Sequence, residues 1–250
     1  MIDEVIIPAA GLGSRMAEIT RDRPKCMAPF LGGTILSRLL RQLAVYAPRR
    51  IHIVGGHRAD VLARYLATPE FGSLPINLLH NAEYASTNSF ASVAVALAEA
   101  KGQVLMVNSD VVYDPEIIRR MVESAAPFAF AIDRQSYSEE SEKLVANSEG
   151  RVVLIAKTVV AADAAGCSLD LYRLNLHQGG EVWQTMIRAF AQRPGARKRL
   201  FEDFLDHALL AIPFACVETD EREWYEIDTE AELKDAENSF VSFDRLSGQL

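Results

Sequence analysis

The stretch that decides the fold is IIPAAGLGSRMAEITRDRPKCMAPF, residues 6–30. It begins as a short apolar strand and then turns at Gly11 and Gly13, a pattern typical of turns that bind phosphate through exposed backbone amides. Met16 stands where the third glycine of a dinucleotide fingerprint belongs, and the Lys-Ser or Lys-Thr pair of a Walker loop is missing. The turn therefore belongs to neither of the two commonest phosphate loops.

Two cations follow this turn. Arg15 lies two residues after the second glycine and Lys25 ten residues further on, directly after Pro24, which restricts the backbone that carries the ammonium. Amides and two cations together suit a triphosphate. A surface turn with two solvated cations is the alternative, and for two glycines alone it would be the better interpretation.

Composition limits the classes of function. The chain has 250 residues, 49% apolar and 24% charged, as in a globular protein with a substantial core. A net charge of −8 argues against nucleic acid as the partner, although one local basic cluster is enough for a small anion. Three widely spaced cysteines fit neither a disulfide framework nor a zinc site.

The sequence also bears on location. The first residues lack the basic start and apolar core of a secretion signal, and no apolar run is long enough to span a bilayer. We therefore expect a cytoplasmic protein that acts without a membrane partner.

Apolar strand-like runs alternate with helical spacing in the first half of the chain. Strands are predicted at residues 5–8, 51–54, 76–79 and 104–107, and helices at 35–45, 61–66 and 90–98. A helix capped by Asp114 with Pro115 at its first position comes next, followed by a strand at 128–132. Such alternation predicts an α/β fold, Rossmann-like, with a mostly parallel sheet.

The pattern changes after residue 132. Residues 152–155 and 168–174 read as two strands paired with each other, before helices at 182–191 and 203–210. Strands at 212–217 and 224–227 and a last helix from residue 229 follow. We expect a single domain over residues 1–250, with a small mixed substrate lobe at about residues 133–205.

Two aspartates follow strands. Asp110, in VLMVNSDVVYD (residues 104–114), ends an apolar strand at the edge where α/β sheets bind ligands, and a carboxylate there suits Mg²⁺. Capping of the next helix is the alternative, but Asp114 is better placed for it. Asp228, in REWYEIDTEAEL (residues 222–233), stands just before a helix that either Asp228 or Thr229 could cap.

These motifs together resemble the sugar-phosphate type of nucleotidyltransferase, whose signature is AAGxGxR followed by PKxM or PKxL. The matching residues are Ala9, Ala10, Gly11, Gly13, Arg15, Pro24, Lys25 and Met27. The resemblance implies the nucleotide-diphospho-sugar transferase type of fold. It also implies that the loop, including Ser14, and Arg15 hold the triphosphate. Lys25 would contact the α-phosphate and the acceptor phosphate, and Asp110 and Asp228 would bind a catalytic Mg²⁺.

One segment is similar to a particular branch of that family. In HNAEYASTNSFASVAVAL (residues 80–97), the residues Asn81, Tyr84, Thr87, Asn88 and Ser92 resemble the cytidylyltransferases that act on phosphocholine, 2-aminoethylphosphonate and related small phosphates. The likeness implies nucleotide contacts for Asn81, Thr87 and Asn88. Many of those enzymes have a second Asn where this chain has Ser89, so the acceptor and the base stay open. The alternative role for Asn88 is to cap the helix that follows it, which is compatible with a contact to the substrate.

The same resemblance points to acceptor contacts in the lobe. Lys157 matches a lysine that could hold the acceptor's phosphate, with an exposed, solvated lysine as an equal alternative. Glu202 and Asp203 match an acidic pair that could meet a cationic head of the acceptor, and the favoured alternative is a pair of first-turn helix acids.

The implied reaction joins CTP to a small phosphate or phosphonate and releases pyrophosphate, with Lys25, Arg15 and Asp110 as its catalytic residues. One alternative is a sugar-1-phosphate nucleotidylyltransferase that uses UTP, GTP or dTTP. Another is a non-catalytic nucleotide-binding regulator of the same fold. A homodimer is possible, since dimers are common in the family that the chain resembles.

Overall fold

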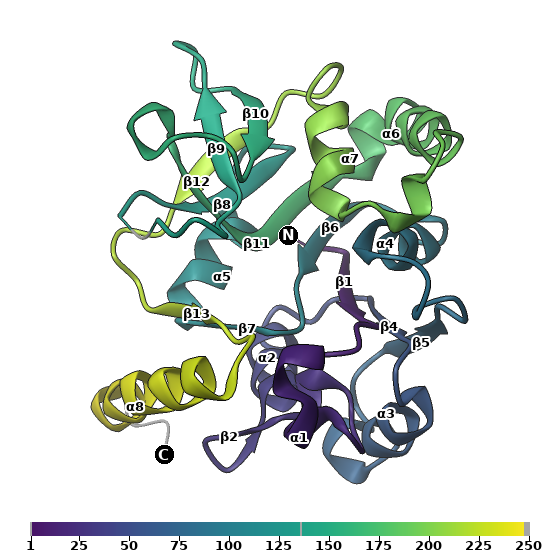
Figure 1. Cartoon of the computed structure of the whole chain (residues 1–250), viewed down its shortest axis with the longest axis vertical. Helices are drawn as coiled ribbons and strands as arrows, with labels where there is room; N and C mark the ends of the chain where they lie inside the picture. The colour runs from purple at the N-terminus through teal and green to yellow at the C-terminus, as the bar shows by residue number, and fades with distance from the viewer. Residues whose placement is uncertain (1, 136, 248–250) are drawn as a thin grey trace.

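The computed structural model describes residues 2–135 and 137–247, and its centre is a nine-stranded sheet (Figure 1). Seven strands follow one another in the order β10-β9-β11-β6-β1-β4-β5, while β8 pairs with β11 and β12. The strands are β1 (Glu4–Ala9), β2 (Pro29–Phe30), β3 (Gly33–Thr34), β4 (Arg50–Gly55), β5 (Ile76–His80), β6 (Gln103–Val107), β7 (Val111–Tyr113), β8 (Ala129–Asp133), β9 (Lys143–Ala146), β10 (Val152–Ala156), β11 (Gly166–Asn175), β12 (Ala215–Glu218) and β13 (Trp224–Glu226).

Helices connect these strands. They are α1 (Ala17–Thr20), α2 (Ile35–Ala44), α3 (Ala59–Leu66), α4 (Ser89–Leu97), α5 (Pro115–Glu123), α6 (Leu176–Ala191), α7 (Phe201–Ala208) and α8 (Glu230–Ser247), with short 3₁₀ turns at Ser14–Met16, Lys25–Met27, Pro69–Phe71, Ala161–Asp163 and Ala196–Lys198. No helix of the described part of the chain is both long and apolar enough to cross a membrane.

The first half of the chain builds the parallel part of the sheet, as the sequence predicts. β1 pairs in parallel with both β4 and β6, and β4 pairs in parallel with β5. The register sets Ala9 opposite Gly55, so the glycine turn after β1 and the turn after β4 leave the same edge of the sheet. This edge is where ligands of open α/β sheets bind.

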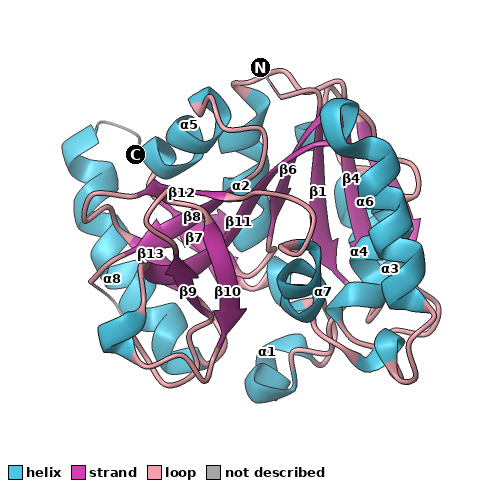
Figure 2. Ribbon diagram, turned by 90° about the horizontal axis from the view of Figure 1, so that it is seen from above, coloured by secondary structure: helices cyan, strands magenta, loops and turns pink. Residues whose placement is uncertain are grey.

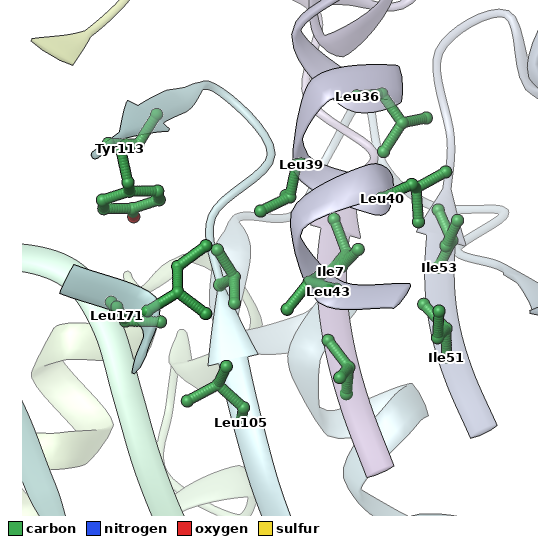
Figure 3. Close-up of a cluster of buried hydrophobic side chains, with 14 of the residues drawn as sticks. Ile7, Leu36, Leu39, Leu40, Leu43, Ile51, Ile53, Leu105, Tyr113 and Leu171 are labelled. Atoms are coloured by element: carbon green, nitrogen blue, oxygen red, sulfur yellow. The ribbon is translucent and has the colours of Figure 1, made fainter. Parts of the chain in front are cut away.

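Alternating side chains of the strands supply two cores, one on each face of the sheet. In β1, Ile7 packs toward the α2, α3 and α5 side, whereas Ile6 packs toward α4, α6 and α7. Figure 2 shows helices on both sides of the strands, and Figure 3 shows α2 covering the first face through Leu36, Leu39 and Leu40. Burying both faces explains why β1 reads as a continuous apolar run rather than an alternating one.

The second half contains the main corrections to the sequence-based prediction. The strands predicted at 152–155 and 168–174 exist as β10 and β11, but they are not partners, because β9 lies between them and pairs antiparallel with both. The sequence pattern did not predict β9, because its four residues follow a long polar run. Helix α6 begins at Leu176, six residues before the predicted start.

A third, smaller core contains residues from the N-terminal and the C-terminal parts of the chain. Met16, Phe30, Ile227 and Phe240 pack together, so α8 and β13 lie against the segment that follows the glycine turn. Figure 1 shows α8 and β13 beside β7, far from the N-terminal strand in sequence. The division into one domain with a substrate lobe stays a prediction.

Candidate active site

A cavity of about 370 Å³ opens at the carboxyl ends of β1 and β6. Backbone and side chains of the glycine turn form one wall, and the residues after β6 form another. Its lining consists of Pro8, Ala9, Ala10, Gly11, Gly13, Ser14, Arg15, Lys25, Cys26, Thr87, Asn88, Ser89, Ser92, Asn108, Ser109, Asp110, Leu200, Glu226 and Asp228. All three motifs singled out in the sequence therefore meet in one place.

Lys25 contacts both of the aspartates that line this cavity. Its Nζ donates to Asp110 Oδ2 at 2.7 Å and also contacts Asp228 Oδ1. Burial opposes the charged ammonium, but the attraction of Asp110 and then of Asp228 outweighs it and raises the pKa of Lys25 above its ordinary value. The ammonium therefore stays charged at neutral pH and holds the two carboxylates together.

Backbone pairing brings the two aspartates side by side. β13 pairs antiparallel with β7, with Glu226 opposite Val111, and the amide of Ile227 donates to the Asp110 carbonyl at 2.9 Å. The side chain that caps α8 is Thr229, whose Oγ1 accepts from the Glu232 amide. Asp228 is thus released from the capping role that the sequence left open, and its carboxylate faces Lys25 and Arg15.

The glycine turn depends on Gly13. Its φ is +62°, and a Cβ at this position would lie 2.8 Å from Thr20 Cγ2 and 3.1 Å from Lys25 Cβ. The amides of Gly11, Leu12 and Gly13 have no acceptor among the described residues, so they are available to an anionic ligand.

Gly13→Ala is expected to destabilise the fold by about 1–3 kcal/mol, because an L-residue is strained at this φ and its methyl group would overlap Thr20. Urea unfolding of the wild type and the variant measures the difference. Gly150→Ala is the matched control, since Gly150 has a φ of +74° with nothing within 4 Å of the added Cβ. An equal loss in both variants would show that packing against Thr20 contributes nothing.

Asp110 and Asp228 fit the requirements of a divalent cation. Both have oxygens in contact with the single Nζ of Lys25, so these oxygens lie close together. The described residues contain no group of three or more His, Cys, Asp or Glu side chains with metal-site geometry. Two carboxylates completed by substrate phosphates are what Mg²⁺ commonly uses, so this pair matches Mg²⁺ rather than a metal held by protein alone.

The predicted nucleotide contacts of the segment before α4 divide into two kinds. Thr87 and Asn88 line the cavity. Asn88 also caps α4, because its Oδ1 accepts from the Ser89 amide at 2.8 Å. Asn81 is buried and lies outside the lining, where its Nδ2 donates to Thr87 Oγ1 and Ser92 Oγ. It thereby holds the wall of the cavity in shape.

The predicted acceptor residues other than Lys25 lie outside the cavity lining. Lys157 pairs with Glu140 at 3.1 Å. Asp203 is exposed and its Oδ2 accepts from the Leu200 amide, as a first-turn helix acid does. Glu202 is buried, and its Oε1 accepts from the Tyr172 hydroxyl at 2.8 Å. Their contact with an acceptor stays a prediction.

Glu202 belongs to an acidic group next to the cavity, whose other two members, Asp170 and Glu226, the sequence did not point to. The hydroxyl oxygen of Tyr172 lies 2.9 Å from Asp170 Oδ1 and 2.8 Å from Glu202 Oε1. Burial and then the charge of Glu202 raise the pKa of Asp170 to about 8, and burial raises that of Glu202 to about 7. Burial, followed by Asp170, Asp110 and Asp228, raises the pKa of Glu226 to about 8.

This acidic group predicts a pH-dependent stability. Asp170 and Glu202 hold their protons to higher pH when folded than when unfolded, so the folded state binds more protons between their ordinary and raised pKa values. The stabilising contribution of these two carboxyls is fully present at pH values below their ordinary pKa values, and it is lost as the pH rises toward about 8. Calorimetry from pH 5 to 8 should therefore show a falling Tm, and a smaller fall in Asp170→Asn. The exposed Asp163→Asn is the control, and an unchanged slope in Asp170→Asn would contradict the assignment.

Comparison with known proteins shows which family the chain is similar to. The family described as the MobA-like NTP transferase domain matches residues 5–195. A CMP-5'-(3-aminopropyl)phosphonate synthase of Streptomyces rubellomurinus is 33% identical over 165 residues, covering 66% of this chain and 24% of that protein. A CTP:phosphoglutamine cytidylyltransferase of Campylobacter jejuni is 28% identical over 135 residues, covering 52% of each. The matches thus span about a quarter to a half of these relatives' length.

Solved structures agree on the fold. The CTP:phosphocholine cytidylyltransferase of Streptococcus pneumoniae superposes with a TM-score of 0.75 at 17% identity, covering 95% of this chain and 98% of the other. The nucleotide-diphospho-sugar transferase type of fold expected from the sequence is therefore confirmed. The match over residues 5–195, most of the chain, shows that the chain belongs to the MobA-like NTP transferase family.

Proposed function

We propose that this chain is a Mg²⁺-dependent cytidylyltransferase, which joins CTP to a small phosphate or phosphonate and releases pyrophosphate. The observation that carries the proposal is the contact of Lys25 with both Asp110 and Asp228, directly beside the glycine turn. A non-catalytic regulator would need the nucleotide-binding turn but has no use for a buried lysine between two carboxylates.

The reaction needs two anions to meet. An oxygen of the acceptor's phosphate attacks the α-phosphorus of CTP, forming a new P–O bond, while the bond to the β-phosphate breaks and its electron pair leaves with pyrophosphate. Lys25 draws the α-phosphate and the acceptor together and so offsets their repulsion. The amides of the turn and Arg15 hold the leaving β- and γ-phosphates. A phosphate oxygen is already ionised at neutral pH, so no general base is required.

Asp110 and Asp228 are the residues that would hold Mg²⁺. When bound, the ion would stabilise charge on the phosphate oxygens. The chain's own contribution is placement: the β7–β13 pairing fixes the two carboxylates, and Lys25 shares them with the ion. Thr87 and Asn88, which also line the cavity, are the proposed contacts to the nucleoside.

We infer from the acidic group that the acceptor carries an amino or ammonium group. Glu202 is buried and Asp170 is half-buried, while Glu226 is exposed to the cavity. The pKa values of all three carboxyls are raised, and a bound cation would stabilise their charged forms. Glu226 lines the cavity itself, so the group adjoins the space left for an acceptor. The names of the relatives, with an aminopropylphosphonate product and a phosphoglutamine substrate, are consistent with amine-bearing acceptors.

The test is pyrophosphate release with Mg²⁺, for each of the four nucleoside triphosphates against a panel of acceptors. The panel contains phosphocholine, 2-aminoethylphosphonate, their uncharged analogues ethyl phosphate and ethylphosphonate, and glucose 1-phosphate. We expect release with CTP and an amine-bearing acceptor, and much less with the uncharged analogue. Release with glucose 1-phosphate and UTP or dTTP would instead assign the chain to the sugar branch. No release with any pair, while CTP still binds, would favour the regulator.

A further inference from the structure

The turn that follows β4 contacts the start of the glycine turn and the end of helix α1, which follows the glycine turn. The amide of His57 donates to the carbonyl of Ala10 at 3.1 Å, where the glycine turn begins. The ring Nε2 of the same residue lies 2.9 Å from the carbonyl oxygen of Thr20, where the segment after the turn ends. A carbonyl oxygen only accepts, so His57 Nε2 carries the hydrogen of this bond.

A chain of hydrogen bonds continues from Thr20 into the turn. Thr20 is buried, and its Oγ1 lies 3.0 Å from both the Gly13 and the Met16 carbonyl oxygens. Gly13 in turn packs against Lys25, since a Cβ on Gly13 would lie 3.1 Å from Lys25 Cβ. His57 is therefore connected through Thr20 to the backbone that presents the amides.

The neighbouring residue shows how closely the two turns pack. A Cβ at Gly56 would lie 2.7 Å from the Ala10 carbonyl oxygen and 2.6 Å from Tyr84 Cβ. Only a glycine permits this approach, and it brings His57 within reach of Ala10 and of Thr20. Tyr84 completes the contact, with its ring centroid 6.3 Å from that of His57.

We propose that His57 is a positioning residue that sets the glycine turn for triphosphate binding, through Ala10 and through Thr20. The inference rests on the proposed function of that turn. The amides of residues 11–13 have no intramolecular acceptor in the described chain, so their placement depends on these flanking bonds. Amides that move out of position lose hydrogen bonds to the phosphate oxygens of CTP, which weakens CTP binding.

The variants separate the bond from the bulk of the ring. His57→Leu removes the donor, whereas His57→Gln retains an N–H group at a reach similar to that of Nε2. Thr20→Val keeps the shape of Thr20 and removes its hydroxyl, which tests the same chain at its second link. His80→Leu is the matched control, because His80 is an exposed histidine at the end of the neighbouring strand β5 and lies outside the cavity lining.

Two measurements are made on the full-length protein. Hydrogen exchange of the peptide covering residues 10–20 reports the turn directly, without any substrate. Titration with CTP and Mg²⁺, alongside KM and kcat, reports the consequence for nucleotide binding. We expect faster exchange and about a fivefold to tenfold rise in the Kd and KM for CTP in His57→Leu and Thr20→Val, the scale of one hydrogen bond, with kcat changed much less. His57→Gln should restore both readouts, and His80→Leu should match the wild type.

Several results would overturn the inference. Unchanged exchange in His57→Leu would show that the ring does not hold the turn. Faster exchange with an unchanged Kd would show a structural role only, as would failure of His57→Gln to restore binding while it restores exchange. Failure of the proposed function is distinguishable. A wild type that binds CTP but releases no pyrophosphate with any acceptor would overturn the proposed function and leave the role of His57 standing, whereas a wild type that binds no nucleoside triphosphate would overturn both.

Discussion

Lys25→Ala is expected to lower kcat by about 10²–10³-fold, the usual cost of removing one group that stabilises charge in a transition state. Lys25 is the buried cation between Asp110 and Asp228, and its ammonium remains charged at neutral pH because those carboxylates raise its pKa. Without it, the α-phosphate and the acceptor's phosphate must approach each other against their own repulsion. Steady-state kinetics with CTP and the preferred acceptor of the panel measures the loss.

A second signature separates this loss from simple misfolding. Lys25→Ala removes the ammonium between Asp110 and Asp228 and leaves Arg15 as the partner of Asp228, so Mg²⁺ no longer competes with the ammonium for the carboxylate oxygens. Mg²⁺ should therefore raise the Tm more in Lys25→Ala than in the wild type. Arg23→Ala is the matched control, because Arg23 is a nearby cation in an exposed pair with Asp22. A Lys25→Ala enzyme with wild-type kcat would contradict the mechanism.

Asp228→Asn is expected to lower kcat/KM by about 10²–10³-fold. The amide keeps the shape of the side chain and removes its charge, so Lys25 retains Asp110 alone and Arg15 loses its carboxylate partner. A weaker carboxylate pair binds Mg²⁺ less tightly, and the Mg²⁺ concentration for half-maximal rate should rise. Kinetics at several Mg²⁺ concentrations measures both quantities.

The effect of Mg²⁺ on stability should move in opposite directions in the two variants. Asp228→Asn should show a smaller Mg²⁺-induced rise in Tm than the wild type, whereas Lys25→Ala should show a larger one. Asp220→Asn is the control, since Asp220 is an exposed acid paired with Arg120 at the surface, where an ion pair contributes little. A normal Mg²⁺ requirement in Asp228→Asn would remove Asp228 from the proposed metal site.

Local sequence patterns predicted the parallel core and placed the glycine turn and Asp110 at one edge of the sheet. Apolar runs with helical spacing between them specify βαβ units, and the carboxyl ends of parallel strands share one edge. Lys25 and Asp110 follow from that rule. Asp228 is reached through β13, whose pairing with β7 is antiparallel and lies outside the main sheet, so only the resemblance to known enzymes connected it with Asp110.

Only Glu202 of the acidic group was a candidate from the sequence, through the family resemblance, and its grouping with Asp170 and Glu226 could not be predicted because the three residues are far apart in the chain. Asp170, Glu202 and Glu226 come from β11, α7 and β13, and each reads locally as an ordinary strand or helix acid. A weak signal existed in β11, where Asp170 interrupts an otherwise apolar run. The role of His57 has no sequence signal either, since it depends on how closely two turns pack at Gly56.

The central claim is that the acceptor's phosphate attacks the α-phosphorus of CTP, and ³¹P NMR of the reaction tests it most directly. The reaction is run with Mg²⁺ and either phosphocholine or 2-aminoethylphosphonate as the acceptor. The account predicts one equivalent of pyrophosphate and a new pair of coupled resonances, in which the α-phosphorus is joined through oxygen to the acceptor's phosphorus. Formation of CDP with transfer of the γ-phosphate, or of CMP and pyrophosphate without a joined product, would contradict it.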